Sequence, residues 1–255
     1  MCFTQTMSWV FTVLGFGGAA FIYRYIPSMY FIAHTIFYFA WMELLQAVTY
    51  PYLDQCDNWW NKVLTFLGMV HVCFQPLVTN FMAANEVKNN PVHYERFMFA
   101  CRLSILFGFW MMARVLFEMF GITKSSVSDE CKYTYNTESL RGTNLCSYTG
   151  HVHMGWHYPM ADNHYFWPSI NLHAFLSFGP FAVHPEEPVM IFKCIMLILT
   201  GPLFAMYLTP DNSEVAAVWC LYSVGHLLTA GLLHFFFVIG GKFDEVAVEE
   251  KKKLN

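Results

Sequence analysis

The sequence predicts an all-α protein, a polytopic membrane helix bundle of about seven transmembrane helices with a disulfide-stapled extracytoplasmic loop. The composition is the first reason. Of the 255 residues, 56% are hydrophobic and only 13% are charged, whereas typical soluble domains carry ~25% charged residues. The second reason is that several apolar runs approach the ~20 residues that an α-helix needs to cross a bilayer.

Each predicted helix is an apolar run between turn-forming or charged residues. Pro27 and Pro51 follow the first and second runs, where proline interrupts helical hydrogen bonding. Trp59 and Trp60 precede the third run, and paired tryptophans suit a membrane interface. Pro76 lies inside that run and predicts a kink. The predicted spans are residues 8–23, 29–50, 61–84, 97–120, 166–183, 189–208 and 214–240.

The predicted spans form one domain. Gly15, Gly17 and Gly18 give the first helix a face of small residues, which predicts a closely packed neighbour. Residues 1–241 form the transmembrane domain, and a charged cytosolic tail follows at 242–255. Residues 121–165 are too polar to span a membrane and are long enough to fold as an extracytoplasmic cap.

The charge pattern predicts the partners and the orientation. A net charge of -4 offers no basic surface for nucleic acid, so membrane lipids are the expected partners. Arg24, Lys88 and Arg96 follow odd-numbered spans or lie in short loops on one side, which favours a cytosolic C-terminus. Lys252 and Lys253 match a dilysine retrieval signal, which predicts the endoplasmic reticulum or secretory pathway. The alternative is that these lysines only anchor the chain on the positive-inside face.

The cysteines agree with this orientation. Cys2, Cys56, Cys131 and Cys146 all fall on the extracytoplasmic side, and no cysteine falls in a predicted cytosolic loop. Disulfides form in an oxidising lumen. We expect Cys131–Cys146 to staple the long loop and Cys2–Cys56 to tie the N-terminus to the second loop, with chance placement as the alternative.

Polar side chains inside the second and third spans are the first candidate site. Such groups are costly in a bilayer, and they tend to face the bundle interior, pair with one another or mark a functional site. Glu43 and Gln46 are three residues apart, and His71 and Gln75 are four apart, so each pair shares one helix face. We interpret Glu43 and His71 as candidate catalytic residues. The candidate ligand-binding residues are Gln46, Gln75, Asn80 and Arg114.

Arg114 also has a simpler interpretation. It lies near the outer end of the fourth span, where it could pair with Glu118 or Glu43 or serve as an interfacial anchor.

Three histidines near the middle or outer half of their spans suggest a metal site. His71, His173 and His226 with Glu43 would suit zinc or another transition metal, with one position open for water. Glu43 would then be a general base or would orient a ligating histidine. Two alternatives remain: a buried hydrogen-bond network that holds the helices together, and a proton- or ligand-handling site without metal.

The long loop contains a second cluster of histidines and methionines. Dense His and Met on an oxidising side can bind copper or zinc. His151 and His153 alternate as they would on a strand. The alternatives are an aromatic cap at the interface and a lid over the bundle site. The cluster consists of His151, His153, Met154, His157, Met160 and His164.

The sequence Met1-Cys2-Phe3-Thr4 resembles uncharacterised multi-pass membrane proteins of bacteria, algae and large viruses that begin Met-Cys-Phe-Ser. The resemblance covers the first third of the chain and includes Glu43-Leu44-Leu45-Gln46 and the His71 and Gln75-Pro76 positions. It implies that Cys2, Glu43, Gln46, His71 and Gln75 belong to one set, and it implies no activity.

Two further comparisons are less close. A weaker likeness to seven-span zinc amidases of the alkaline ceramidase type fails at the last span, because His226 and His234 do not match the paired histidines there. Retinal proteins are excluded, since residues 214–240 contain no lysine for a Schiff base.

The sequence therefore predicts an integral membrane protein with a polar intramembrane site for a lipid or small ligand, with or without a metal. The alternative is a non-enzymatic receptor-like, transport or assembly subunit whose polar groups only lock the helices. The sequence does not decide whether the protein is an enzyme.

Overall fold

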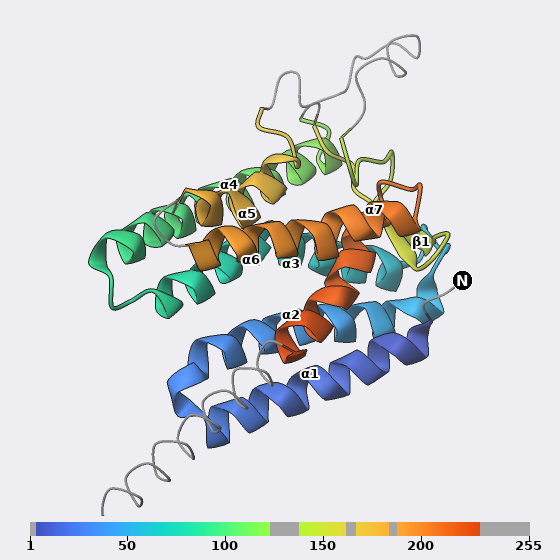
Figure 1. Ribbon diagram of the computed structural model, residues 1–255. Helices are drawn as coiled ribbons and strands as arrows, with labels where there is room; N and C mark the ends of the chain where they lie inside the picture. Colours follow the sequence, from blue (N-terminus) through green and yellow to red (C-terminus); the bar gives the residue numbers. More distant parts are fainter. Residues whose placement is uncertain (1–3, 123–137, 162–166, 184–187, 230–255) are drawn as a thin grey trace, which may run out of the picture.

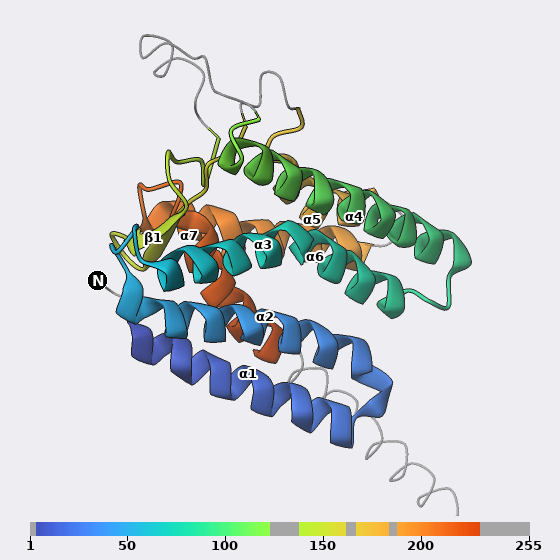
Figure 2. The same cartoon turned by 180° about the vertical axis from the view of Figure 1, so that it is seen from behind.

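The structure is a computed structural model that describes residues 4–122, 138–161, 167–183 and 188–229. It is a helix bundle with a small two-stranded sheet at one end (Figure 1). The start of α1 lies at the same end as the sheet in both views (Figures 1 and 2). We call this end the outer end, in keeping with the predicted extracytoplasmic cap.

Four long helices come first, and shorter helices follow the sheet. The long helices are α1 (Gln5–Tyr25), α2 (Tyr30–Thr49), α3 (Trp59–Glu86) and α4 (Pro91–Met119). The later helices are α5 (Leu172–Ala182), α6 (Pro188–Ile198), α7 (Phe204–Leu208) and an unlabelled final helix, Val215–Thr229. Short helical turns flank these elements at Pro27–Met29, Tyr50–Tyr52 and Leu199–Leu203.

Five of these helical segments are long and apolar enough to cross a membrane: Gln5–Tyr25, Pro27–Tyr52, Trp59–Glu86, Pro91–Met119 and Met190–Leu208. They match the first four predicted spans and the sixth. The fifth predicted span is only the short apolar helix α5. The seventh is described from Val215 to Thr229, and its predicted continuation to residue 240 lies outside the described chain.

Polar caps and close packing explain where the long helices begin and how they pair. The Asn58 and Asn90 side chains accept hydrogen bonds from the first backbone N–H groups of α3 and α4, as helix N-caps do. At Gly15, a Cβ atom would lie 2.6 Å from the Cβ of Ala40 on α2. Gly15 therefore has α2 as its close neighbour and is required there, whereas Gly18 lies against Leu228 of the final helix and Gly17 has no neighbour within 4 Å.

The sheet is a hairpin that docks on α3. Strands β1 (Cys146–Thr149) and β2 (Met154–His157) are antiparallel, with Cys146 opposite His157 and Thr149 opposite Met154. Asn61 of α3 donates to the Ser147 carbonyl and accepts from the Ser147 N–H, at 2.8 and 3.0 Å. The expectation that His151 and His153 alternate along a strand is wrong, because both lie in the turn that joins β1 to β2.

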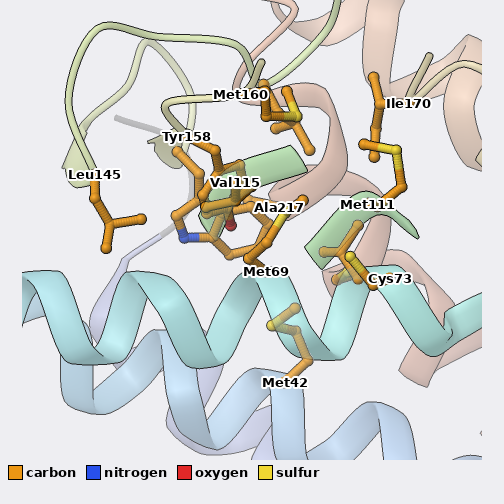
Figure 3. Packing of buried hydrophobic residues seen from close by; sticks show 14 of the residues in the cluster. Met42, Met69, Cys73, Met111, Val115, Leu145, Tyr158, Met160, Ile170 and Ala217 are labelled. Carbon is orange, nitrogen blue, oxygen red and sulfur yellow. The ribbon is translucent and has the colours of Figure 1, made fainter. Parts of the chain in front are cut away.

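The hairpin packs into the outer end of the bundle. Trp156 and Tyr158 are almost fully buried, in one cluster with Met69 of α3 and Met111 of α4. Figure 3 shows Tyr158 above α3, on the side from which Met69 projects. Gly68 of α3 faces these rings, and a Cβ there would be in ordinary contact with the Tyr158 hydroxyl, 3.5 Å away. The cap is thus part of the core.

The disulfide joins two segments that the sequence analysis had paired with other partners. Cys56 is bonded to Cys146, with 5.0 Å between their Cα atoms. Both predicted pairs, Cys131–Cys146 and Cys2–Cys56, are wrong, because each pair needs a sulfur that is already used; Cys2 and Cys131 lie outside the described chain.

Hydrogen bonds on the second loop explain this pairing. The Asp54 carboxylate accepts from the N–H and the hydroxyl of Thr149, at 2.9 and 2.6 Å, and the Asp54 N–H donates to the Ser147 carbonyl. These bonds hold the loop alongside β1, which brings Cys56 to Cys146. Proximity in sequence was therefore a poor guide to proximity in space.

Breaking this bridge should loosen the cap. The bond joins residues 90 positions apart, so the Cys56→Ser/Cys146→Ser pair should destabilise the folded protein by about 2–5 kcal/mol. Thermal unfolding of the detergent-purified protein measures the change, and peptide mapping under non-reducing conditions should recover one cross-linked Cys56–Cys146 peptide. A Cys73→Ser variant is the control, since Cys73 is a buried free thiol. Peptides that link Cys146 to Cys131 would contradict the structure.

Candidate functional site

The carboxyl group of Glu43 is the most unusual group in the bundle. Glu43 is fully buried on α2, and neither of its oxygens has a hydrogen-bond partner. Ser8 of α1 is also fully buried, and its hydroxyl lies near the Glu43 carboxyl without completing a hydrogen bond. A carboxyl group in such surroundings must either carry a proton or meet a positively charged or hydrogen-donating partner.

A histidine from the cap lies one helical turn away from Glu43 along α2. The Nε2 atom of His153 is 2.6 Å from Oε1 of Gln46, and its Nδ1 is 2.6 Å from the hydroxyl of Tyr50. Because an amide oxygen only accepts, Nε2–H is the donor and Nδ1 accepts from Tyr50. Gln46 then donates to the carbonyl of Ala217 in the final helix, at 3.5 Å. This chain of contacts, the His153 latch, joins the cap to α2 and to the final helix.

The latch requires a neutral imidazole. Burial lowers the pKa of His153 to about 4, because the charged ring would lose its water. Protonation would also place a proton on Nδ1, which would then no longer accept from Tyr50. The latch is therefore closed at neutral pH.

Glu214 holds the turn that carries His153. Its carboxylate accepts from the backbone N–H groups of His151, Val152 and His153, and from the hydroxyl of Thr209 at 2.5 Å. Glu214 is fully buried, so these four donors replace its water. A Cβ at Gly150 would lie 2.7 Å from the Glu214 carboxyl carbon, so this turn needs glycine there.

Arg114 is bound to the cap. It donates to both carboxylate oxygens of Glu138, at 2.6 and 2.7 Å, and both side chains are fully buried. It also donates to the carbonyls of Ala161 and Pro168. The anticipated partners Glu118 and Glu43 are replaced by Glu138, and the side chain anchors the cap to α4.

Two further candidates lie beside prolines in neighbouring helices. Pro180 inside α5 has no N–H, which leaves the Leu176 carbonyl without its helical donor, and Asn80 of α3 donates to that carbonyl at 2.8 Å. Pro76 inside α3 likewise frees the Val72 carbonyl, and His173 of α5 lies near the backbone of Val72, although its Nε2 atom completes no hydrogen bond. Asn80 therefore satisfies a backbone group across the α3–α5 contact.

The other candidates on α3 point in different directions. Gln75 is buried and donates to the sulfur of Cys220 in the final helix, at 3.0 Å. The His71 ring stacks on Tyr38 of α2, with centroids 3.9 Å apart. Nε2 of His71 has no hydrogen-bond partner. The predicted pairing of Glu43 with Gln46 on one buried face is confirmed, whereas His71 faces Tyr38.

The structure does not gather the predicted metal ligands. Among the described residues, no group of three or more His, Cys, Asp or Glu side chains lies close enough together to hold a metal ion. His173 contacts Val72 and Trp219, and His226 lies near Tyr222. His71, His173 and His226 are thus not brought together with Glu43 in this structure, and the metal site stays a prediction.

The loop cluster separates as well. His151 is exposed, and His153 is buried in the latch. His157 packs on Tyr148, with ring centroids 4.4 Å apart, and burial lowers its pKa. Met154 and Met160 are buried in the hydrophobic core, and His164 lies outside the described chain.

Comparison with known proteins places the whole bundle in one family. A family model described as "Family of unknown function (DUF5765)" matches residues 6–235. The chain belongs to this family. No curated protein and no solved structure matches the chain. Membership agrees with the expected resemblance to uncharacterised proteins, and the significance of the opening motif Met1-Cys2-Phe3-Thr4 stays a prediction.

Sequence reasoning missed several residues that this member of the family uses to build the site. From the sequence, Ser8 is only the first residue of the first predicted span, and Tyr50 only the last residue of the second. Glu138 falls in the long loop and Glu214 at the start of the seventh span, and both are buried anchors of the cap. A usable signal was present for Glu214, since an acidic residue directly before an apolar run suits a helix N-terminus.

The latch predicts acid sensitivity. The unfolded chain binds a proton at His153 below about pH 6.5, whereas the folded protein binds it only near pH 4. The unfolded state therefore binds more protons in that window, and stability falls as the pH drops from 6.5 to 4, by on the order of 3 kcal/mol. Thermal unfolding between pH 7.5 and 4.5 should show a shallower decline for His153→Gln. The exposed neighbour variant His151→Gln should keep the wild-type decline; equal slopes in all three proteins would contradict the latch.

The Arg114–Glu138 pair predicts a large asymmetric effect. Arg114→Met should cost about 3–5 kcal/mol, because it leaves the Glu138 carboxylate buried without its charge partner. The double variant Arg114→Met/Glu138→Met should recover part of that loss. Arg102→Met is the matched control, since Arg102 meets Glu95 at 3.9 Å with both side chains exposed, and it should cost less than about 1 kcal/mol. Chemical unfolding of the purified protein measures all three.

Proposed function

We propose that the protein is a membrane protein whose outer end contains a polar site, centred on Glu43, for a small ligand or the polar part of a lipid. One observation carries this proposal: the Glu43 carboxyl is fully buried with no partner for either oxygen. The other buried carboxylates of the outer end, Glu138 and Glu214, are each compensated by several donors. A group left unsatisfied at a cost to stability is a candidate for function.

The chemistry of the site favours a ligand with hydrogen-bond donors or positive charge. Such a ligand would supply what the Glu43 oxygens lack, and Ser8 adds a hydroxyl that can donate or accept. A proton is the smallest occupant that meets the same need. Glu43 is thus the residue that would bind the ligand or exchange the proton.

The His153 latch gives this site a lid. Gln46 and Glu43 are three residues apart on one buried face of α2, so the latch lies directly outside the carboxyl group. A ligand that enters from the outer end would have to displace His153 from Gln46 and Tyr50. We therefore interpret the cap hairpin as the element that controls access.

A second function is favoured by the remaining polar groups. Asn80, His173 and Gln75 all connect helices, as an assembly or transport subunit without chemistry would require. In that alternative, Glu43 would also be a helix contact. The two functions differ in what they predict for the stability of a Glu43 variant.

The topology is proposed with the function. We infer seven spans, with the two short apolar helices as the fifth and seventh, an extracytoplasmic cap and a cytosolic C-terminus in a secretory membrane. The Cys56–Cys146 bridge suits an oxidising compartment. The Lys/Arg bias of the short loops supports the cytosolic tail.

A Glu43 variant separates the two functions. Glu43→Met keeps the side-chain volume and removes two unsatisfied atoms, so it should stabilise the protein by about 1–3 kcal/mol while it abolishes binding. Thermal unfolding gives the stability. Native mass spectrometry and metal analysis of wild type and Glu43→Met, purified side by side, give the bound species.

The expected result is a non-covalent adduct on the wild type that Glu43→Met lacks. Glu95→Gln, which changes an exposed carboxylate, should keep the adduct and the wild-type stability. A strongly destabilised Glu43→Met with an unchanged adduct pattern would favour the assembly role and reject the binding site.

A further inference from the structure

A second candidate site lies at the opposite end of the molecule. An open pocket of ≈ 370 Å³ is lined by Tyr23, Pro27, Tyr30 and His34. It lies where α1 ends and α2 begins, far from the sheet and the start of α1 (Figures 1 and 2). This volume is within the range of small-ligand pockets, roughly 300–1,000 Å³.

Three aromatic rings form the pocket wall. The rings of Tyr23 and Tyr30 each stand nearly perpendicular to His34, at 87° and 83°, with centroids 6.2 and 6.0 Å from it. A cation within ≈ 6 Å of several ring centroids is held by their π-electrons, which is how aromatic cages bind quaternary ammonium groups.

Two of these rings are fixed before any ligand arrives. The Tyr30 hydroxyl donates to Oδ1 of Asn85 on α3 at 2.6 Å. The His34 Nδ1–H donates to the backbone carbonyl of Tyr30 at 2.7 Å, which fixes the orientation of the ring. Tyrosines are common at membrane interfaces, but a tyrosine that only lies at the interface does not need a hydrogen bond to a neighbouring helix. The cage is pre-organised, and a pre-organised site loses less entropy on binding.

The charges around the pocket select the ligand further. None of its four lining residues has a carboxylate, so a primary ammonium would find no ion pair there. Arg24 follows Tyr23 in the last turn of α1, with its guanidinium over the Tyr25 ring, 5.7 Å from the ring centroid, so it adds a positive charge to the same helix end as the pocket. This charge repels a simple cation and attracts a zwitterion whose negative group lies a few ångströms from its quaternary nitrogen.

The position in the bundle indicates where such a zwitterion comes from. The pocket lies between the ends of two consecutive candidate spans, Gln5–Tyr25 and Pro27–Tyr52. The ends of membrane spans lie at the depth of the lipid headgroups. A phospholipid could therefore reach the cage with its headgroup while its chains stay in the bilayer.

We propose that the cage of Tyr23, Tyr30 and His34 binds the phosphocholine headgroup of a membrane lipid, with the choline against the rings and the phosphate toward Arg24. This site is independent of the Glu43 site, which lies near the cap. The lipid would bind at the end of the bundle opposite the cap, independently of the ligand that binds at Glu43.

Native mass spectrometry with defined lipids tests the proposal. The protein, purified in a maltoside detergent, is mixed with equal amounts of phosphatidylcholine, phosphatidylethanolamine and phosphatidylglycerol of the same acyl chains. Wild type should retain phosphatidylcholine over phosphatidylethanolamine by at least about threefold, the size expected from cation–π contacts to several rings. Tyr23→Ala/His34→Ala should bring that ratio close to one. Arg24→Gln should weaken the retention of both zwitterionic lipids.

The controls separate the cage from a general aromatic effect. Tyr23→Phe keeps the ring and should keep the preference. Tyr207→Ala removes a tyrosine that is 83% exposed at the outer end of α7, and it should also keep the preference. Tyr30 is left unchanged, because its hydroxyl joins α2 to α3. Thermal unfolding of each variant verifies that the bundle is intact.

Three results would overturn the proposal. Equal retention of the three lipids by wild type would leave no headgroup preference to explain. A preference that survives in Tyr23→Ala/His34→Ala would place it elsewhere. Binding of free phosphocholine without any preference among the lipids would reject the membrane lipid as the ligand. Glu43→Met should leave the phosphatidylcholine preference unchanged, so failure of one site is distinguishable from failure of the other.

Discussion

The outer end of this bundle depends on the compensation of buried carboxylates. Glu138 and Glu214 enter the protein interior only because Arg114, backbone N–H groups and Thr209 replace the water that they lose. These contacts hold the two ends of the cap, and the disulfide at Cys146 holds its first strand. The cap can therefore fill the outer end like a core element. Against that background, an uncompensated Glu43 carboxyl is an exception that requires a reason.

The same constraint explains one polar contact between the helices. In a low-dielectric interior, a carbonyl freed by proline must find another donor. Pro180 and Pro76 lie in two helices that touch, and the Leu176 carbonyl freed by Pro180 accepts from Asn80 of the opposite helix. This exchange gives the Asn80 side chain a structural role in an apolar run. A polar side chain in a membrane helix is therefore evidence for function only if it does not serve as the hydrogen-bond partner of a backbone group.

Features that depend on local periodicity could be predicted from the sequence, whereas contacts between distant segments could not. Apolar run length gave the long helices, and helical spacing placed Glu43 and Gln46 on one buried face, because both depend on local periodicity alone. The disulfide, the Arg114 partner and the scattered histidines depend on how the cap folds back over residues 50–61. Spacing contains no information about that fold, since Asp54 and Asn61 meet β1 across about a third of the chain.

Helix α2 contributes residues to Glu43's surroundings, to the His153 latch and to the aromatic pocket. Its outer half places Glu43 and Gln46, with Tyr50 directly after the helix, on the side where His153 enters, and its inner end places Tyr30 and His34 at the aromatic pocket. The latch involves the cap and also the final helix, through Ala217. In the function we propose, access to Glu43 would require this latch to open, and an occupant that supplies donors would offset the loss of the His153 contacts. Ligand binding and cap position would then be coupled through the exchange of hydrogen-bond partners along α2.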